Sequence, residues 1–226
     1  MKKIKTRFFV ERDFDAGDVS LTMYGEPAEF GVLGEAWHET LKAAVAGLRA
    51  TRPNSRYWQS IGSNYVGFPI VYNYRHVLEL YLKGVLIEAE PALTLDGQPP
   101  IPDNVFRSHS FEKLRPEVER VFAALGISFD FGIDGFRTRD DFRSMLTALD
   151  QIEVRYPIDT SRKPAMGDRW LRFNVFEFAE KMDAILDILR WYPSVISEMV
   201  DARQEAAYEA QQEAWANADF EPPDYD

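Results

Sequence analysis

The longest apolar stretch of the chain, residues 64–90, limits the folds that this sequence can adopt. From about Tyr72 onward it reads as one helix. Its apolar side chains cover most of the helix circumference: Val71, Tyr74, Val77, Leu78, Tyr81, Leu82, Val85 and Leu86. A helix that is apolar nearly all round belongs in the middle of a bundle. The sequence therefore predicts a central helix over Tyr72–Glu90, and Pro69 predicts irregular chain just before it.

A polar stripe runs along this apolar helix. Tyr72, His76, Glu79 and Lys83 are spaced i, i+4, i+7 and i+11, which places them on one face, and Arg75 can reach Glu79 one turn on. Charges on a buried helix need partners, because an unpaired buried charge is costly. The favoured interpretation is an internal polar seam that fixes the register of the helices. The alternative is a functional site built on a rigid scaffold.

The rest of the chain predicts a mainly α fold, an antiparallel helical bundle. Further amphipathic helices are expected over about 35–50, 111–125, 138–149 and 174–191, with a bend at Pro116. Residues 4–24 alternate between apolar and polar around a Gly/Asp cluster, a pattern that permits a small β-hairpin. We expect three parts: an N-terminal extension over 1–34, a helical bundle over 35–193, and an acidic C-terminal helix and tail over 194–226.

The amino-acid composition limits the kinds of functional site that the chain can form. The chain has no cysteine, which excludes disulfides, thiolate metal ligands and a cysteine nucleophile. It has no secretory signal and no apolar run of about 20 residues, so we expect a soluble, cytoplasmic protein that does not engage a membrane. No Gly-rich phosphate loop and no metal-ligand motif is present, so no cofactor or metal is expected.

Charge is distributed unevenly along the chain. The net charge is −11, and residues 194–226 alone carry nine acidic side chains and one Arg, a net of −8. The first 193 residues therefore carry only −3 (−11 minus −8), which leaves room for a local basic site. The acidic tail can shield such a site from polyanions or contact a basic partner protein.

A basic loop precedes the last helix of the predicted bundle. Residues 155–172 hold five basic and two acidic side chains, a net of +3. Its candidate substrate-binding residues are Arg155, Tyr156, Arg162, Lys163 and Arg169. The loop is either a solvated charged turn or a patch that binds phosphate groups, for example those of RNA.

Three motifs in this order resemble the HEPN-like proteins of prokaryotes. They are Arg75-His76 opening a helix with Glu79 and Lys83, the Ser-His-Ser turn over Ser108–Leu114, and the Arg-Tyr-Pro loop over Arg155–Pro157. The resemblance covers roughly residues 60–190. It implies an antiparallel helical bundle, commonly a homodimer, among toxins, toxin–antitoxin pairs, phage-defence proteins and RNA-processing factors. Active members resemble metal-independent endoribonucleases that use an Arg and a His.

The sequence departs from that family at the catalytic motif. Nuclease members carry an Arg followed by a His after four to six residues, and no Arg stands at that spacing before His38, His76 or His109. Two functions stay open. The favoured one is a HEPN-like module that acts by dimerisation and by binding RNA, a nucleotide or a partner protein in a bacterial defence or stress system. The alternative is a divergent endoribonuclease with the candidate catalytic residues His76, His109, Arg75 and Arg155.

Two further histidine contexts have simpler interpretations. Glu35 and His38 have the Glu-x-x-His spacing of di-iron bundles, which need two such helices and two more glutamates. A surface salt bridge or an ordinary helix residue is therefore expected at His38. His109, between two serines, is more often a residue at a helix entry than a catalyst.

Overall fold

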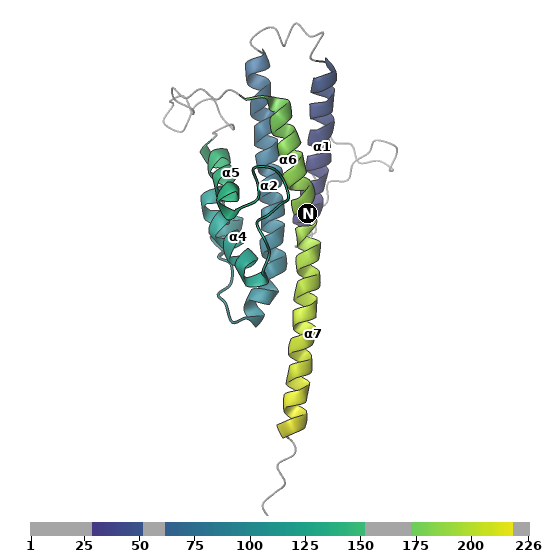
Figure 1. Cartoon of the computed structure of the whole chain (residues 1–226), viewed down its shortest axis with the longest axis vertical. Coiled ribbons are helices and arrows are strands. Elements are labelled where there is room, and N and C mark those ends of the chain that lie inside the picture. The colour runs from purple at the N-terminus through teal and green to yellow at the C-terminus, as the bar shows by residue number, and fades with distance from the viewer. Residues whose placement is uncertain (1–28, 52–61, 152–172, 219–226) are drawn as a thin grey trace, which may run out of the picture.

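The computed structural model describes residues 29–51, 62–151 and 173–218, which form a bundle of α-helices (Figure 1). The helices are α1 (Glu29–Thr51), α2 (Gly62–Leu95), α3 (Asp103–Phe106), α4 (Phe111–Leu125), α5 (Arg139–Gln151), α6 (Val175–Leu189) and α7 (Tyr192–Ala218). No strand occurs within these ranges. The predicted mainly α fold is confirmed. The predicted hairpin over residues 4–24 lies outside the described residues.

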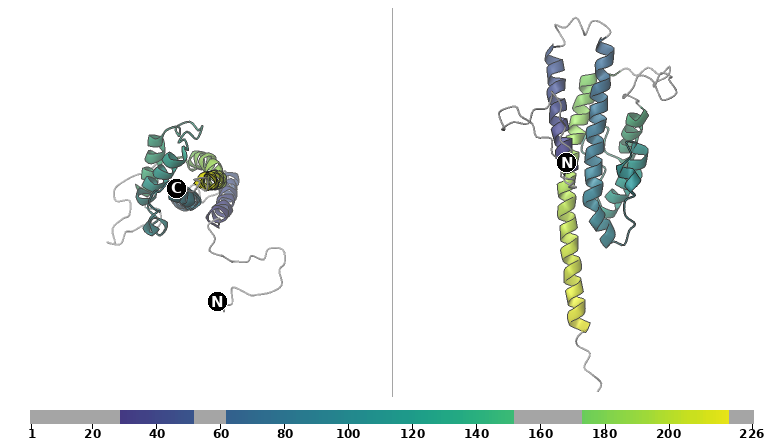
Figure 2. Two further views of the ribbon diagram at one scale, coloured as in Figure 1. Left: turned by 90° about the horizontal axis from the view of Figure 1, so that it is seen from below. Right: turned by 180° about the vertical axis from the view of Figure 1, so that it is seen from behind.

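Helix α2 is the centre of the molecule. It lies between α1 and α6 on one side and the α4–α5 pair on the other, and the first turns of α7 pack along its C-terminal half (Figures 1 and 2). Its side chains are almost completely buried from Val77 to Leu86, and the largest of them, Tyr74 and Tyr81, have at most 1% of their surface exposed. The prediction of a buried central helix is confirmed. None of the described helices is long and apolar enough to cross a membrane.

Three prolines lie inside helices, and the sequence predicted an interruption at two of them, Pro69 and Pro116. Pro69 and Pro91 lie within α2, and Pro116 lies within α4. The prediction of irregular chain near Pro69 was therefore wrong. Pro116 does not divide α4 into two helices, and the bend expected there stays a prediction. All three prolines are exposed, so water can bond the carbonyl four residues earlier that the missing N–H leaves unpaired. Burial of the apolar faces then outweighs the local cost of each proline.

Helix α1 crosses α2 at very short range. It begins at Glu29, six residues before the predicted start, because Gly31 and Gly34 lie inside it and do not precede it. A Cβ atom at position 34 would lie 2.8 Å from Cε1 of Tyr81, which is closer than van der Waals contact. Gly34 therefore allows the two helix backbones to approach each other around the Tyr81 ring.

Helix α7 leaves the bundle after its first turns. Ile196 and Val200 are buried against the body, and Arg203 forms an ion pair of 2.8 Å with Asp96 and donates to the carbonyl of Ala124 at 3.0 Å. Every residue from 204 to 216 is exposed. In Figures 1 and 2 this part of α7 extends well beyond the other helices.

Candidate functional site

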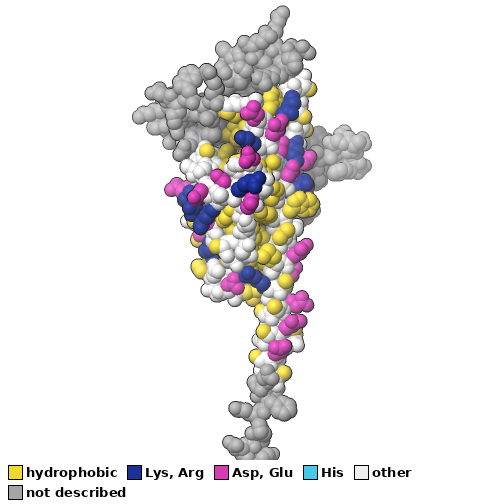
Figure 3. Space-filling model, in the orientation of Figure 1, with side chains coloured by type: hydrophobic (Ala, Val, Ile, Leu, Met, Phe, Trp, Pro, Cys, Tyr) yellow, Lys and Arg dark blue, Asp and Glu magenta, His cyan; other side chains and the backbone are white. Residues whose placement is uncertain are grey.

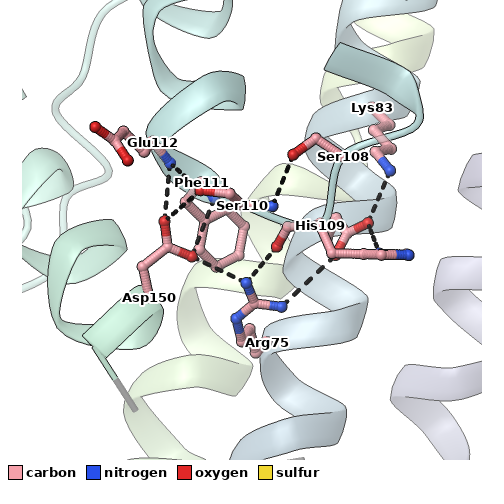
Figure 4. Close-up of polar contacts among 9 residues, drawn as sticks. Arg75, Lys83, Ser108, His109, Ser110, Phe111, Glu112 and Asp150 are labelled. Atoms are coloured by element: carbon pink, nitrogen blue, oxygen red, sulfur yellow. Dashed lines mark hydrogen bonds and ion pairs between the residues drawn. The ribbon is translucent and has the colours of Figure 1, made fainter. Parts of the chain in front are cut away.

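A buried carboxylate on α2 gathers three cationic or polar side chains (Figure 4). Only 3% of the surface of Glu79 is exposed. Its Oε1 lies 2.7 Å from Nζ of Lys83 and 2.9 Å from Nδ1 of His109, and its Oε2 lies 3.8 Å from a guanidinium nitrogen of Arg75. The predicted i, i+4 pairs of the polar stripe therefore form, and His109 joins them from the turn before α4.

Arg75 connects this cluster to a second carboxylate. It donates to Oδ1 of Asp150, near the C-terminal end of α5, at 2.9 Å, and to the backbone carbonyl of His109. Its guanidinium also lies over the ring of Phe111, 4.9 Å from the ring centre. With 15% of its side chain exposed, Arg75 is held on several sides and joins α2, the Ser-His-Ser turn and α5.

Asp150 in turn caps the start of α4. It accepts hydrogen bonds from the backbone N–H groups of Phe111 at 3.0 Å and Glu112 at 2.8 Å, and from the hydroxyl of Ser110 at 3.1 Å. The first N–H groups of a helix have no partner within the helix, and an acceptor from another helix satisfies them here. The Ser-His-Ser turn is thus fixed between α2 and α5 by the bonds of the His109 carbonyl, the His109 ring and the Ser110 hydroxyl.

The network balances its formal charges and leaves one group open to solvent. Arg75 and Lys83 offset Glu79 and Asp150, and the Lys83 side chain is only 5% exposed. The side chain of His109 is 58% exposed. Because a carboxylate can only accept, Nδ1 of His109 donates to Glu79, and Nε2 is the nitrogen left for an external group. The arrangement therefore orients an imidazole at the surface while it keeps Arg75 occupied.

Of the other predicted site residues, only His76 lies in the described part of the chain. His76 packs its ring edge-on against Trp37 of α1, at 5.6 Å between ring centres, and parallel to Tyr72 at 6.4 Å. The structure brings Arg75 and His109 together and keeps His76 with these aromatic rings. The candidate residues Arg155, Tyr156, Arg162, Lys163 and Arg169 lie outside the described residues.

A second buried polar group, centred on Asp183 of α6, was not predicted. Nε2 of His38 lies 2.9 Å from Oδ1 of Asp183, and the hydroxyl of Tyr74 donates to the same oxygen at 2.8 Å. His38 is 1% exposed, so the expectation of a surface salt bridge was wrong, whereas the alternative of an ordinary helix residue agrees with its bond to Asp183. Burial, and then the bond to Asp183, raise the pKa of Tyr74 far above its usual value. The only signal for its burial was the helical spacing of apolar residues in α1. His38 falls three residues before the buried Leu41 and therefore lies on the same face.

A shallow cleft of about 410 Å³ lies beside Asp183, between α1 and α6. The cations at its border are already paired: Lys42 lies 2.9 Å from Asp187, and Arg49 lies 2.6 Å from Glu180. No set of three potential metal ligands occurs in the part of the chain that the structure describes. The cleft is therefore lined by small apolar side chains and by charged side chains that are already paired within the protein.

The projecting part of α7 carries two large exposed side chains. Tyr208 is 62% exposed and Trp215 is 71% exposed, and their spacing of seven residues puts them on one side of the helix. Glu205, Glu209 and Glu213 follow one another at i, i+4 and i+8 along a neighbouring side. Residues 204–218 contain no Lys or Arg. This segment is an apolar and acidic surface outside the bundle.

Comparison with known proteins adds no relative. No family model, no curated protein and no solved structure matches the chain. Functional roles therefore have to be argued from the contacts of this molecule, and the likeness to HEPN-like proteins stays a prediction.

Proposed function

We propose that this protein is a non-catalytic, HEPN-like helical module that binds a partner protein through the projecting part of α7, residues 204–218. The resemblance described above would put such a module in a bacterial defence or stress system. The observation that supports the proposal is the exposure of Tyr208 and Trp215 on a helix that has already left the bundle. Arg203 is the last residue in the described part of α7 that bonds to the body, through Asp96 and the carbonyl of Ala124.

The chemistry of this surface defines the partner. Aromatic side chains at helical spacing are typical anchors of a helix that lies in an apolar groove. Glu205, Glu209 and Glu213 lie beside these anchors without a neighbouring cation on the same stretch. A partner with an apolar groove edged by Lys or Arg would complement both features. An isolated helix of this length is marginal in water, so binding would also stabilise it.

A second copy of the chain is a poorer partner for α7. Pairing two copies of residues 204–218 would bring together glutamates with no Lys or Arg to offset them. The homodimer that the family resemblance implies would therefore form through another surface. The proposed binding role of α7 is therefore independent of the oligomeric state.

The contacts of Arg75 weigh against catalysis. A nuclease of the family type needs an arginine that is free to stabilise charge on a phosphate. Here Arg75 is bound by Asp150, by the His109 carbonyl and by Glu79, and only 15% of its side chain is exposed. An arginine with this many protein acceptors contributes to the position of α4 and α5.

The experiment compares three full-length proteins. They are the wild type, the aromatic variant Tyr208→Ser/Trp215→Ser, and the control Ala206→Ser/Ala210→Ser on the opposite side of α7. Each protein is immobilised and exposed to a lysate of the native host. A protein captured by the wild type is then purified, and its affinity for all three is measured by calorimetry at low and high salt.

We expect the purified partner to bind the wild type and the control equally and the aromatic variant at least tenfold more weakly. Affinity should fall with added salt, since acidic side chains contribute. Equal binding to all three proteins would contradict the proposal. The proposal would also be contradicted if sedimentation showed a dimer of the wild type and the control but not of the aromatic variant, because α7 would then bind a second copy of the chain.

One observation favours a second candidate, a divergent metal-independent endoribonuclease. Glu79 holds Nδ1 of His109 at 2.9 Å, and more than half of the His109 side chain is exposed, as a general base requires. Mixed RNA incubated with the protein in EDTA tests it. Cleavage that His109→Ala abolishes and His76→Ala spares would establish this candidate. Absence of cleavage, or cleavage that EDTA abolishes, would refute it.

A further inference from the structure

Three arginines converge on one buried carboxylate between α4 and α5. Glu119 of α4 has 7% of its side chain exposed. Arg143 of α5 binds it with two nitrogens, Nε at 2.6 Å and Nη2 at 2.7 Å. Arg139 of α5 donates to the same carboxylate, and Nε of Arg115, one turn before Glu119 on α4, lies 3.9 Å from it.

The positive charge of this cluster exceeds what the fold needs. Arg143 alone neutralises Glu119 in a two-pronged geometry, which is the strongest arrangement for this pair of groups. Arg115 and Arg139 add two more cations. Among the described residues, the only other acidic group that contacts the cluster is the carboxylate of Asp140, which is 86% exposed and lies 3.4 Å from Arg143. Three cations against two anions leave a net charge of +1.

The cluster also faces solvent. The side chains of Arg115, Arg139 and Arg143 are 34%, 50% and 41% exposed. In Figure 3 a group of Lys and Arg side chains lies at the surface over the α4–α5 side of the body. The bonds from Arg143, and then the bond and charge of Arg139, lower the pKa of Glu119 to about 2, so the carboxylate stays charged and keeps the arginines in place.

We propose that Arg115, Arg139 and Arg143 form a binding site for a phosphate group. Guanidinium groups present several N–H donors in a plane that matches the oxygens of phosphate. Glu119 engages only part of these donors: its contact with Arg139 is through Nη2, and its contact with Arg115 is through Nε at 3.9 Å. The site is distinct from α7 and from the Glu79 network, and the phosphate belongs either to RNA or to a free phosphorylated small molecule.

The test uses pyrophosphate and a single-stranded RNA 12-mer as probes, each titrated into the full-length protein at low salt. The site variant is Arg115→Gln/Arg139→Gln, which spares Arg143 because that residue joins α4 to α5. The control is Arg49→Gln, which removes one exposed arginine of α1 that pairs with Glu180 and lies over the ring of Phe176. Thermal melting of each protein checks that the fold is kept.

We expect the wild type and Arg49→Gln to bind at least one probe, and the site variant to bind it at least tenfold more weakly. For RNA, the slope of affinity against salt should fall by about 1 to 2, since each lost phosphate contact releases one counterion less. Binding of pyrophosphate alone assigns the site to a free ligand, and binding of RNA alone assigns it to nucleic acid. No binding of either probe, or equal binding by wild type and site variant, would overturn the proposal.

Discussion

Removing either partner of the buried Glu79–Lys83 ion pair should destabilise the protein, but by different amounts. Glu79→Ala leaves the ammonium of Lys83 95% buried without its only ion-pair partner among the described residues. Lys83→Met leaves Glu79 bound to His109 at 2.9 Å and near Arg75 at 3.8 Å. The first substitution creates an unpaired buried charge, and the second does not.

The expected losses follow from this difference. Breaking a buried ion pair by removing one partner costs about 3–5 kcal/mol, which is the value expected for Glu79→Ala. For Lys83→Met the carboxylate loses one of its bonds, at a cost of about 1–2 kcal/mol. A double variant, Glu79→Leu/Lys83→Met, replaces the pair by apolar groups of similar volume and should lose less than Glu79→Ala.

Urea unfolding followed by circular dichroism measures these values, with the unfolding slope checked to be the same in all variants. For a domain of this size, the loss in Glu79→Ala corresponds to a fall in melting temperature of about 6–20 °C. A loss below about 1 kcal/mol for Glu79→Ala, or a larger loss for Lys83→Met, would refute the assignment of Glu79 as the centre of the buried network.

Three further predictions concern other parts of the fold. Gly34→Ala should destabilise the protein by about 1–3 kcal/mol in urea unfolding, because the added methyl group collides with Tyr81. Glu119→Gln should lower the free energy of unfolding by about 2 kcal/mol at pH 7. This loss should shrink as the pH falls from about 4.5 toward 2, because a carboxylate with a lowered pKa stabilises the fold only while it is charged. A chain that ends after Arg203 should melt within about 2 °C of the full chain, since the residues removed have no buried side chain in the described part, whereas a chain that ends before Ser194 should melt at a lower temperature.

The central helix and its pairs were predictable because they depend on local periodicity. The spacing of Glu79, Arg75 and Lys83 within one helix placed their charges together, and the apolar positions around them required burial. What the spacing could not supply was the third partner, His109, which lies 30 residues away and arrives through the packing of α4. Local periodicity determines a face of a helix, whereas the tertiary fold determines what covers it.

The errors have a common physical cause. His38 and Asp183 are 145 residues apart, and neither helix alone indicates that they meet. Pro69 and Pro116 were expected to interrupt helices because each lacks an N–H donor. That cost applies fully only where water is excluded, and both residues turned out to be exposed. In each case the missing information was tertiary: which helix covers His38, and whether the two prolines face water.

The Glu79 network also explains why the α4–α5 pair can present the proposed phosphate site in a fixed position. Helix α5 packs mainly on α4, to which Arg139 and Arg143 also tie it through Glu119. These contacts with one neighbour leave its orientation to α2 less defined. The bond from Arg75 to Asp150 supplies that orientation at the C-terminal end of α5. Buried ionic groups contribute to such specificity in some proteins even where they add little stability. If this applies here, Glu79→Leu/Lys83→Met should keep most of the stability but broaden the amide NMR signals of α5, because Arg75 would lose one of the two carboxylates that position it.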